Sequence, residues 1–466
     1  MPLSRREFLG AMSGALALGG LPGAAQAAAT LPRNQIQELR ARVRGPVLAP
    51  GDSGYELARL VFNRRFDSIR PPAVVRVRDT ADVQAAVRWA GRHEVPLVVR
   101  SGGHAYNGAS TSRAAVVLDV GGLDGFALDG KHVTVGPGLR NFRLYTKLAR
   151  RGLTIPSGSC ANVAIGGLAT GGGMGLAGRA LGMTLDRVTA FDVVTAAGER
   201  ERVRAGSSLF WALRGGGGSF AVVTAVHLRP QRVRRAAWFF ASYPAAAREE
   251  LLDVWDDLAP GAPAALTAIC TLSGSGATAF GQYLGSETAL RRLVAPLAQI
   301  GGAGFSAGTS DFLDLQRRWA GCADGGCGSV ARSSFDAAST YVGRRLTARG
   351  RRAFLDAANG GATLILDAHG GAINDVAPEA TAFVHRDARF SVQILSYSPI
   401  VIARARVRHA HSLIAPFGNG EAYQNYADLD LGSPRRAYYG ANHERLRMVK
   451  RVVDPDGRFA PAQGIR

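Results

Sequence analysis

The chain has 466 residues, about three times the ~150 residues typical of one domain, so two domains or one large composite fold are expected. Hydrophobic residues make up 47% and charged residues 20%, which excludes an intrinsically disordered protein. The formal net charge of +20 comes mainly from arginines dispersed along the sequence, and no basic block contains interleaved aromatic residues, so we expect solvated surfaces and no nucleic-acid partner.

The N-terminus has the pattern of an export signal. Arg5 and Arg6 precede a Gly- and Ala-rich apolar stretch, and residues 25–27 are small enough for cleavage. This pattern predicts a twin-arginine signal over 1–27 and a periplasmic or extracellular protein. No later apolar run reaches the length of about 18 residues that a membrane span needs, so no membrane contact beyond export is expected.

The stretch from 71 to 230 alternates strand and helix signals. Helices are predicted to begin with Thr80 and Asn141 as their caps, each followed by apolar residues at helical spacing. Strands are predicted over 73–78, 95–100, 114–120 and 132–135. This order predicts a mixed α/β unit in which turns at the strand ends hold a ligand.

From about 236 to 405 the pattern changes to longer β-rich runs with intervening helices, which predicts an antiparallel sheet. The tail then contains a short strand-like piece, YQNY at 423–426, that would place Tyr423 and Asn425 on one face. A final helix is predicted to stop at Asp454, which precedes a proline.

Three Gly-rich segments, over 98–110, 155–182 and 209–228, each lie beside a strand signal, which suggests that one long ligand is cradled by side-chain-free backbone. The second segment matches G-x-G-x-x-G over 173–178. It lacks the preceding strand of a dinucleotide fingerprint, so an NAD site is rejected.

Four cysteines bear on the redox chemistry. Cys322 and Cys327 flank a Gly-bearing turn, where they are either disulfide-bonded or free. Cys270 lies in a strand-like run and is expected to be a small buried apolar residue.

The segments VRSGGHAYNGAS, PSGSCANVAIGGLATGGGMG and LFWALRGGGGSF, together with the tail from YQNY onward, resemble in order and spacing the berberine bridge enzyme-like FAD-linked oxidases. The resemblance covers roughly 65–235 and 360–466. It implies an α+β fold with a two-part FAD-binding domain of the p-cresol methylhydroxylase type and an antiparallel-sheet substrate domain. We place the FAD domain at 28–235 and 406–466, and the substrate domain at 236–405.

The resemblance implies that His104 bonds to the flavin 8α-methyl group and Cys160 to flavin C6. Without it, a turn-capping histidine and a buried inert cysteine would be the simpler interpretations. In place of the Asn-Phe-Gly of relatives, this chain has Ser219-Phe220-Ala221. Further cofactor contacts are expected from Arg100, Ser101, Gly102, Gly103, Gly108, Ser110, Val163, Gly166, Gly167, Gly171, Gly175, Val222 and Asn425.

The resemblance also assigns Tyr423 as the base that takes the substrate hydroxyl proton. A phenol with a pKa near 10 needs a neighbour that lowers this value. Asp367 and Gln393 are candidate catalytic helpers, with structural hydrogen bonding as an equal alternative for each. His369 and His385 either line the pocket or are ordinary solvated or capped histidines.

The expected function is oxidation of a hydroxyl group of a sugar or secondary-metabolite alcohol, with a small-molecule substrate. Val163, three residues after Cys160, resembles the residue of oxidases, which favours O2 as acceptor and H2O2 as product. An amine- or alkaloid-oxidising member of the same family and a non-catalytic secreted binding protein are the alternatives. No metal site is expected, and the oligomeric state stays open.

Overall fold

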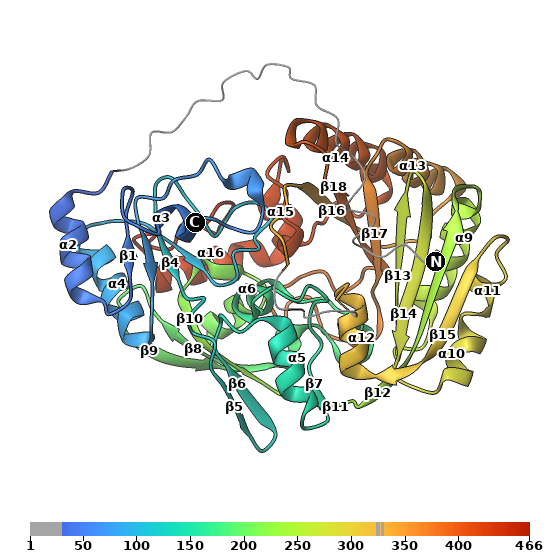
Figure 1. Ribbon diagram of the computed structural model, residues 1–466, viewed down its shortest axis with the longest axis horizontal. Helices are drawn as coiled ribbons and strands as arrows, with labels where there is room; N and C mark the ends of the chain where they lie inside the picture. The colour runs from blue at the N-terminus through green and yellow to red at the C-terminus, as the bar shows by residue number, and fades with distance from the viewer. Residues whose placement is uncertain (1–29, 323–326, 328–329) are drawn as a thin grey trace.

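The computed structural model describes residues 30–322, 327 and 330–466. The predicted export signal over 1–27 lies outside these described residues. The molecule has two lobes: the first and last described parts of the chain share one, and a large antiparallel sheet forms the other (Figure 1). Among the described residues, no helix is both long and apolar enough to cross a membrane.

The first lobe contains a four-stranded sheet in the order β1-β2-β4-β3. β2 and β3 run parallel to β4. Helix α4 (Thr80–Arg92) connects β2 to β3 and buries Val83 against the sheet. The cap of α4 is Asp79, one residue before the predicted cap, because its carboxylate accepts the backbone N–H of Asp82 at 3.0 Å. The strands are β1 (Val47–Leu48), β2 (Val74–Arg76), β3 (Leu97–Arg100) and β4 (Val116–Asp119).

A five-stranded antiparallel sheet, in the order β5-β6-β10-β8-β9, completes this lobe. Residues of β6, β8 and β10 share one hydrophobic cluster with helices from distant parts of the chain, including α6, α8 and α16. The strands are β5 (Phe126–Asp129), β6 (His132–Val135), β8 (Val188–Val194), β9 (Arg200–Arg204) and β10 (Val222–Leu228). The helices are α6 (Ile165–Gly171), α8 (Ser208–Leu213) and α16 (His443–Val453).

The second lobe is a seven-stranded antiparallel sheet in the order β15-β12-β14-β13-β17-β18-β16, which confirms the predicted architecture. Helices α9, α13 and α14 cover one face (Figure 1). The strands are β12 (Arg235–Pro244), β13 (Leu266–Ser273), β14 (Gly276–Tyr283), β15 (Gly304–Asp311), β16 (Asp336–Val342), β17 (Thr363–Ala368) and β18 (Phe390–Ser396). The helices are α9 (Arg248–Gly261), α13 (Ala348–Asn359) and α14 (Ile400–Ile414).

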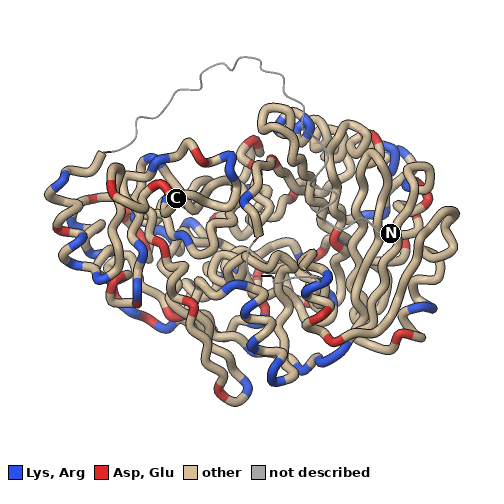
Figure 2. Tube along the Cα trace, in the orientation of Figure 1, with Lys and Arg blue, Asp and Glu red and all other residues tan. Residues whose placement is uncertain are grey.

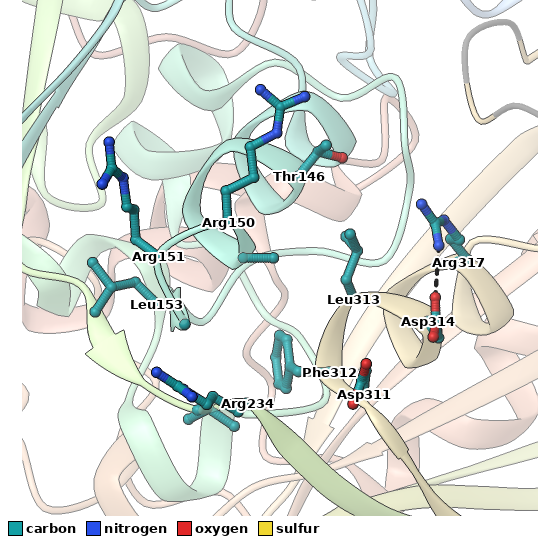
Figure 3. A pocket seen from close by; sticks show the side chains of 13 residues that line it. Thr146, Arg150, Arg151, Leu153, Arg234, Asp311, Phe312, Leu313, Asp314 and Arg317 are labelled. Carbon is teal, nitrogen blue, oxygen red and sulfur yellow. Dashed lines mark hydrogen bonds and ion pairs between the residues drawn. The ribbon is translucent and has the colours of Figure 1, made fainter.

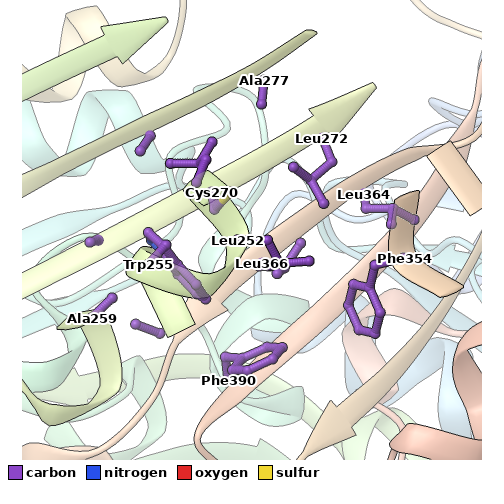
Figure 4. Packing of buried hydrophobic residues seen from close by; sticks show 14 of the residues in the cluster. Leu252, Trp255, Ala259, Cys270, Leu272, Ala277, Phe354, Leu364, Leu366 and Phe390 are labelled. Atoms are coloured by element: carbon purple, nitrogen blue, oxygen red, sulfur yellow. The ribbon is translucent and has the colours of Figure 1, made fainter. Parts of the chain in front are cut away.

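The two faces of this sheet differ because side chains alternate along each strand. On the covered face, Trp255 of α9 and Phe354 of α13 pack with Leu366 and Phe390 of the sheet (Figure 4). On the opposite face, three adjacent strands place mainly polar residues in register. One row is Asp367, Ser391 and Tyr341, and the next is Ile365, Gln393 and Ser339. These rows belong to the candidate site.

Two cysteine predictions have outcomes in this lobe. Cys322 and Cys327 form a disulfide, which was one of the two alternatives. Cys270 is fully buried on β13, and burial raises the pKa of its thiol, so it is the apolar core residue that was predicted.

The C-terminal segment locks onto the first lobe. Helix α16 ends at Asp454 as predicted. The buried Lys450 ammonium donates to the Asp454 carboxylate at 2.6 Å and to the carbonyls of Ser219 and Phe459 at 2.6 and 2.9 Å. One cation therefore ties the tail to the third Gly-rich segment.

We expect Lys450→Met to lower the free energy of unfolding by about 3–5 kcal/mol, because it leaves the buried Asp454 carboxylate without its cation. Chemical denaturation of the flavin-loaded protein measures this change. The matched control, Lys131→Met in an exposed turn, should change stability by less than about 0.5 kcal/mol. Equal stability of the two variants would show that the Lys450 contacts contribute nothing to stability.

Candidate active site

The turn that carries His104 follows directly from a buried strand. β3 ends at Arg100, and Gly103 then takes a φ of +70°, which residues with side chains rarely adopt. The His104 ring stacks on Phe62 with ring centroids 4.2 Å apart. Burial, with the nearby Arg140 guanidinium, lowers the pKa of His104 to about 4. The imidazole is therefore neutral at physiological pH and keeps a lone pair for bond formation.

The Cys160 loop is held against the His104 turn. Arg140 donates to the carbonyl of Gly102 at 3.1 Å and to that of Asn162 at 2.6 Å, so one guanidinium bridges the two segments. Cys160 is an exposed free cysteine, which disagrees with the simpler interpretation of a buried inert thiol. The structure thus brings together the two segments that carry the residues predicted to bond the cofactor.

Asn141 has a different role from the predicted one. Helix α5 (Asn141–Ala149) is preceded by Arg140 at the cap position, and the Asn141 side chain is buried. Its Nδ2 donates to the Cys160 carbonyl at 3.3 Å, and its Oδ1 accepts from the Ser157 hydroxyl at 2.9 Å. Asn141 therefore shapes the Cys160 loop and does not cap the helix.

Polar atoms around the His104 turn fit a bound cofactor. The Ser110 and Thr111 hydroxyls and Arg100 Nη1 are buried and have no hydrogen-bond partner among the described residues. Buried polar groups are normally paired, so a bound molecule is expected to supply the partners. Gly167 is exposed and has open space beside its backbone. These features suit a long polar ligand such as FAD.

Other predicted cofactor contacts in this region also have packing roles. The Ser101 hydroxyl donates to the Pro137 carbonyl, and a side chain on Gly166 would lie 2.6 Å from Pro137. Gly108, with φ +71°, packs under Phe66, whose ring would lie 2.9 Å from an added Cβ. Close packing alone requires both glycines.

The second Gly-rich segment receives the C-terminal tail. An added Cβ on Gly171 would lie 2.0 Å from Asn425 Oδ1, and one on Gly172 would lie 2.6 Å from Tyr423 Oη. At Gly175 the obstacle is the Ser157 carbonyl at 1.8 Å. Chain packing accounts for these glycines, and the predicted cofactor contacts of Gly171 and Gly175 stay predictions.

The third Gly-rich segment divides into two halves. An added Cβ on Gly215 would lie 2.2 Å from the backbone of Phe383, and one on Gly216 would lie 2.5 Å from the Ala212 carbonyl. Gly217 and Gly218 have open space. Other parts of the chain therefore occupy the space beside Gly215 and Gly216, where the third Gly-rich segment was predicted to hold a ligand.

Ser219, the departure from the family pattern, faces the C-terminus. Its hydroxyl accepts the backbone N–H of Ile465 at 3.1 Å.

The YQNY segment is a 3-10 turn, η7 (Gln424–Tyr426), so the predicted strand is wrong. The turn forms because the tail docks on the polar sheet face, where Ser339 Oγ accepts the Tyr423 N–H at 3.0 Å. Tyr423 Oη accepts from the Gly173 N–H at 2.8 Å and from Asn425 Nδ2 at 3.1 Å. Tyr423 and Asn425 are together, although a turn and not a strand unites them.

The environment of Tyr423 does not lower its pKa. The side chain is fully buried, and burial raises its pKa to about 12. The Asp367 side chain, in contrast, is half-buried. Desolvation raises the pKa of its carboxyl to about 7. The Ser391 hydroxyl faces Asp367 Oδ2 at 3.4 Å. Of the two groups, the carboxyl is the better proton acceptor near neutral pH.

Gln393 connects the sheet to an aromatic wall. Its Nε2 donates to the Tyr106 hydroxyl at 2.7 Å, and the Tyr106 ring stacks on Tyr426 at 5.7 Å. Phe335 meets the edge of Tyr106 at 4.9 Å and lies near Phe62, the partner of His104. Phe62, Phe335 and Tyr106 are site residues that the sequence did not predict. Only Tyr106 carried a signal, because it lies two residues after His104.

Two valines complete the predicted set. Val163 is half-buried in the Cys160 loop, and its carbonyl accepts the Asn141 N–H at 2.9 Å. Val222 is fully buried on β10, and its side chain lies in the hydrophobic cluster of the four-stranded sheet. The cofactor contact predicted for Val222 stays a prediction. Because the side chain is in the core, only the backbone of Val222 could make this contact.

A separate pocket of about 690 Å³ opens between α5 and helix α12 (Phe312–Trp319) (Figure 3). Arg150, Arg151 and Arg234 line it, and Arg317 there pairs with Asp314 at 2.6 Å. It shares no residue with the predicted site. Figure 2 shows that basic residues are scattered over both lobes and interspersed with acidic ones, so an arginine-lined surface is not unusual here.

Two family matches correspond to the two parts of the first lobe. The FAD binding domain family matches residues 71–204, and the family described as berberine and berberine like matches residues 422–466. The first match contains the His104 turn and the Cys160 loop, and the second begins at the tail turn with Tyr423.

Relatives that match over nearly their whole length also include FAD-linked and berberine bridge enzyme-like proteins. The uncharacterized FAD-linked oxidoreductase YvdP of Bacillus subtilis is 31% identical over 448 residues, which cover 91% of this chain and 98% of the relative. Chitooligosaccharide oxidase of Gibberella zeae is 27% identical over 473 residues, covering 93% and 95%. The solved structure of Physcomitrella patens BBE-like 1 is 30% identical, with a TM-score of 0.87, covering 92% and 99%. The chain is therefore a member of the berberine bridge enzyme-like family of FAD-linked oxidoreductases.

Proposed function

We propose that this protein is an exported oxidase that carries FAD bonded to both His104 and Cys160 and oxidises a hydroxyl group of a sugar. The observation that carries the proposal is Asp367, a carboxyl group with a pKa near neutrality on a polar sheet face beside Tyr423 and Tyr426. The similarity to chitooligosaccharide oxidase over nearly the full length of both chains supports a carbohydrate substrate.

In this proposal Asp367 takes the proton from the substrate hydroxyl. A general base works best when its pKa lies near the working pH, which fits the carboxyl and not a phenol whose pKa is raised to about 12. Tyr423 then positions the substrate and the tail turn, and Gln393 fixes the Tyr106 wall through their hydrogen bond. This assignment exchanges the roles predicted from the sequence for Tyr423 and Asp367.

Bound FAD would supply the hydride acceptor and the reaction with O2. The chain's contribution is to hold it: the neutral His104 and the exposed Cys160 are available as nucleophiles on adjacent segments. Val163 in the Cys160 loop favours O2 as the electron acceptor, by its resemblance to oxidases.

The two proposed links make a testable pair. We expect His104→Ala and Cys160→Ala each to keep flavin on the chain after acid denaturation, and the double variant to release all of it. Intact mass and visible colour of the denatured protein measure this. Cys270→Ala is the control, since Cys270 is buried in the other lobe and should leave both links in place. A wild type that releases its flavin in acid would contradict both links.

The proposed activity is tested by peroxide release. Purified yellow protein is mixed in air with glucose, N-acetylglucosamine and their β-1,4-linked oligomers, and H2O2 is measured in a peroxidase-coupled assay. We expect at least one sugar to yield one H2O2 per oxidised molecule. If none does while reduced flavin reacts with air, the sugar assignment is wrong.

An amine substrate is the second candidate, because a carboxylate such as Asp367 suits a cationic amine as well as a hydroxyl. Adding primary and secondary aromatic amines to the same assay separates the two classes. If no compound reduces the flavin, the non-catalytic binding protein becomes the better interpretation.

A further inference from the structure

Three buried polar rings lie behind the proposed base. Tyr341, His369 and His385 are all fully buried. The Tyr341 ring stacks on His385 with centroids 4.4 Å apart and meets His369 edge-on at 5.3 Å. None of the steps assigned above uses these residues.

Each ring has a polar atom without a hydrogen-bond partner among the described residues: Tyr341 Oη, His369 Nδ1 and His385 Nε2. Leaving such atoms unpaired would cost about 1–3 kcal/mol each, and buried groups of this kind are normally bridged by ordered water. A buried water needs two to four polar partners, and rings in contact offer them. We therefore expect water between these atoms.

The inner end of this group lies in the same row of the sheet as the proposed base. Tyr341 on β16, Ser391 on β18 and Asp367 on β17 are directly paired neighbours in one row of the sheet. Side chains that are paired in this way have Cβ atoms about 5 Å apart. Tyr341 is thus two strands from the carboxyl that would receive the substrate proton.

The outer end reaches solvent. His385 Nδ1 lies 2.8 Å from Glu421 Oε2, and the Glu421 side chain is 25% exposed. Glu421 also accepts from Asn419 Nδ2 at 3.1 Å. The group therefore spans from the buried row to the surface.

The surroundings of His369 set its protonation state. Burial, with His385, Arg386 and Arg179 nearby, lowers the pKa of His369 to about 3, so this ring stays neutral. Arg386 is itself paired with Asp186 at 2.7 Å. Glu421 is the acidic group in direct contact with His385.

We propose that Tyr341, His385 and Glu421, with water held between Tyr341 Oη, His385 Nε2 and His369 Nδ1, conduct the proton taken up by Asp367 out of the buried site. The inference rests on the proposed function. For each substrate molecule, the carbon loses a hydride to the flavin and the hydroxyl loses its proton to Asp367. The proton then passes through water, Tyr341 and His385 to the Glu421 carboxylate and bulk solvent, which returns Asp367 to its ionised form.

The first test does not depend on activity. A high-resolution crystal structure of the flavin-loaded protein should show at least one ordered water within hydrogen-bond distance of two of the three unpartnered atoms. A dry, closely packed space there would overturn the proposal.

The second test follows the proton itself. Flavin-loaded protein is mixed anaerobically with the active sugar in weak buffer containing a pH indicator. In the wild type we expect one proton to be released in step with loss of flavin colour. In Glu421→Gln and Tyr341→Phe, release should lag by about 10²-fold, and added imidazole should restore it. A structural role alone would not separate release from flavin reduction.

The matched control is Glu38→Gln, which breaks a similar pair with His93 at 2.7 Å in the first lobe and should release its proton on time. Tyr341→Phe removes only a hydroxyl, so it keeps the test valid if Glu421→Gln folds poorly. Proton release in step with flavin reduction in both variants would overturn the route. Absence of flavin reduction by any sugar in the wild type would instead reject the proposed function, and the hydration test would still decide on the route.

Discussion

Replacing Asp367 by Asn should lower kcat by about 10²–10⁴-fold while the flavin stays bound, because the change removes the proposed general base and keeps the shape of its side chain. In the wild type, kcat/KM should rise with pH through about 7, as the carboxyl loses its proton, and then level off. The variant should lack this inflection. Steady-state rates across pH 5–9 with the active sugar measure both effects.

The same change should stabilise the fold. The pKa of Asp367 is raised from an ordinary value of 3.8 to about 7, so between these values the folded state holds a proton that the unfolded state has released. Carrying the charge therefore costs stability that grows as the pH rises through this window and is complete above it. We expect Asp367→Asn to be more stable than the wild type at pH 8 and equally stable near pH 4.

Two companion variants make the result decisive. Asp375→Asn, at an exposed position, should change neither rate nor stability. Tyr423→Phe should cost less than Asp367→Asn and keep the pH inflection, because the phenol is assigned to positioning. If Tyr423→Phe carries the large loss and Asp367→Asn a small one, the phenol is the base and the role given to Asp367 is wrong.

Replacing Arg179 by Met should lower the free energy of unfolding by about 3–5 kcal/mol. Arg179 lies on the short helix α7 (Gly178–Leu181) and is buried, and burial lowers the pKa of its guanidinium to about 10. Among the described residues it has no carboxylate partner. It donates instead to backbone carbonyls, each of which costs about 1–3 kcal/mol if left buried and unpaired. These carbonyls are those of His369 (2.7 Å), Leu266 (2.6 Å), Ala262 (2.7 Å), Pro260 (2.9 Å) and Pro263 (3.4 Å).

These contacts join α7 to the end of helix α9 and to the seven-stranded sheet, so Arg179 fastens the two lobes. A cation also interacts favourably with the carbonyl end of a helix. Arg179→Lys should lose nearly as much stability as Arg179→Met, because one ammonium cannot reach all five carbonyls. Chemical denaturation measures both, with the exposed Arg349→Met as control. A loss below about 1 kcal/mol for Arg179→Met would contradict this role.

The turn that carries His104 could be predicted from the sequence because its signal is local. The turn at His104 needs a glycine at Gly103, where φ is positive, and that requirement is written in a few adjacent residues. The substrate side could not, because it depends on strand register. Asp367, Ser391 and Tyr341 become neighbours only when three strands pair.

Two predictions of local structure, the strand at YQNY and the helix cap at Asn141, were wrong because tertiary contacts decide these segments. Period-two spacing in YQNY predicted a strand, but docking on Ser339 bends this segment into a 3-10 turn. Asn141 has a residue type common at helix caps, yet its side chain instead holds the Cys160 loop. In both cases a tertiary hydrogen bond outweighed the local preference.

The most direct test of the central claim is to mix the yellow, flavin-loaded protein anaerobically with N-acetylglucosamine and glucose oligomers, record the flavin colour, and then admit air. We expect that one of these sugars bleaches the flavin, that a product oxidised at a hydroxyl carbon forms in equal amount, and that air restores the colour with release of H2O2. A flavin that stays yellow with every sugar, while chemical reduction and air still cycle it, would contradict the claim.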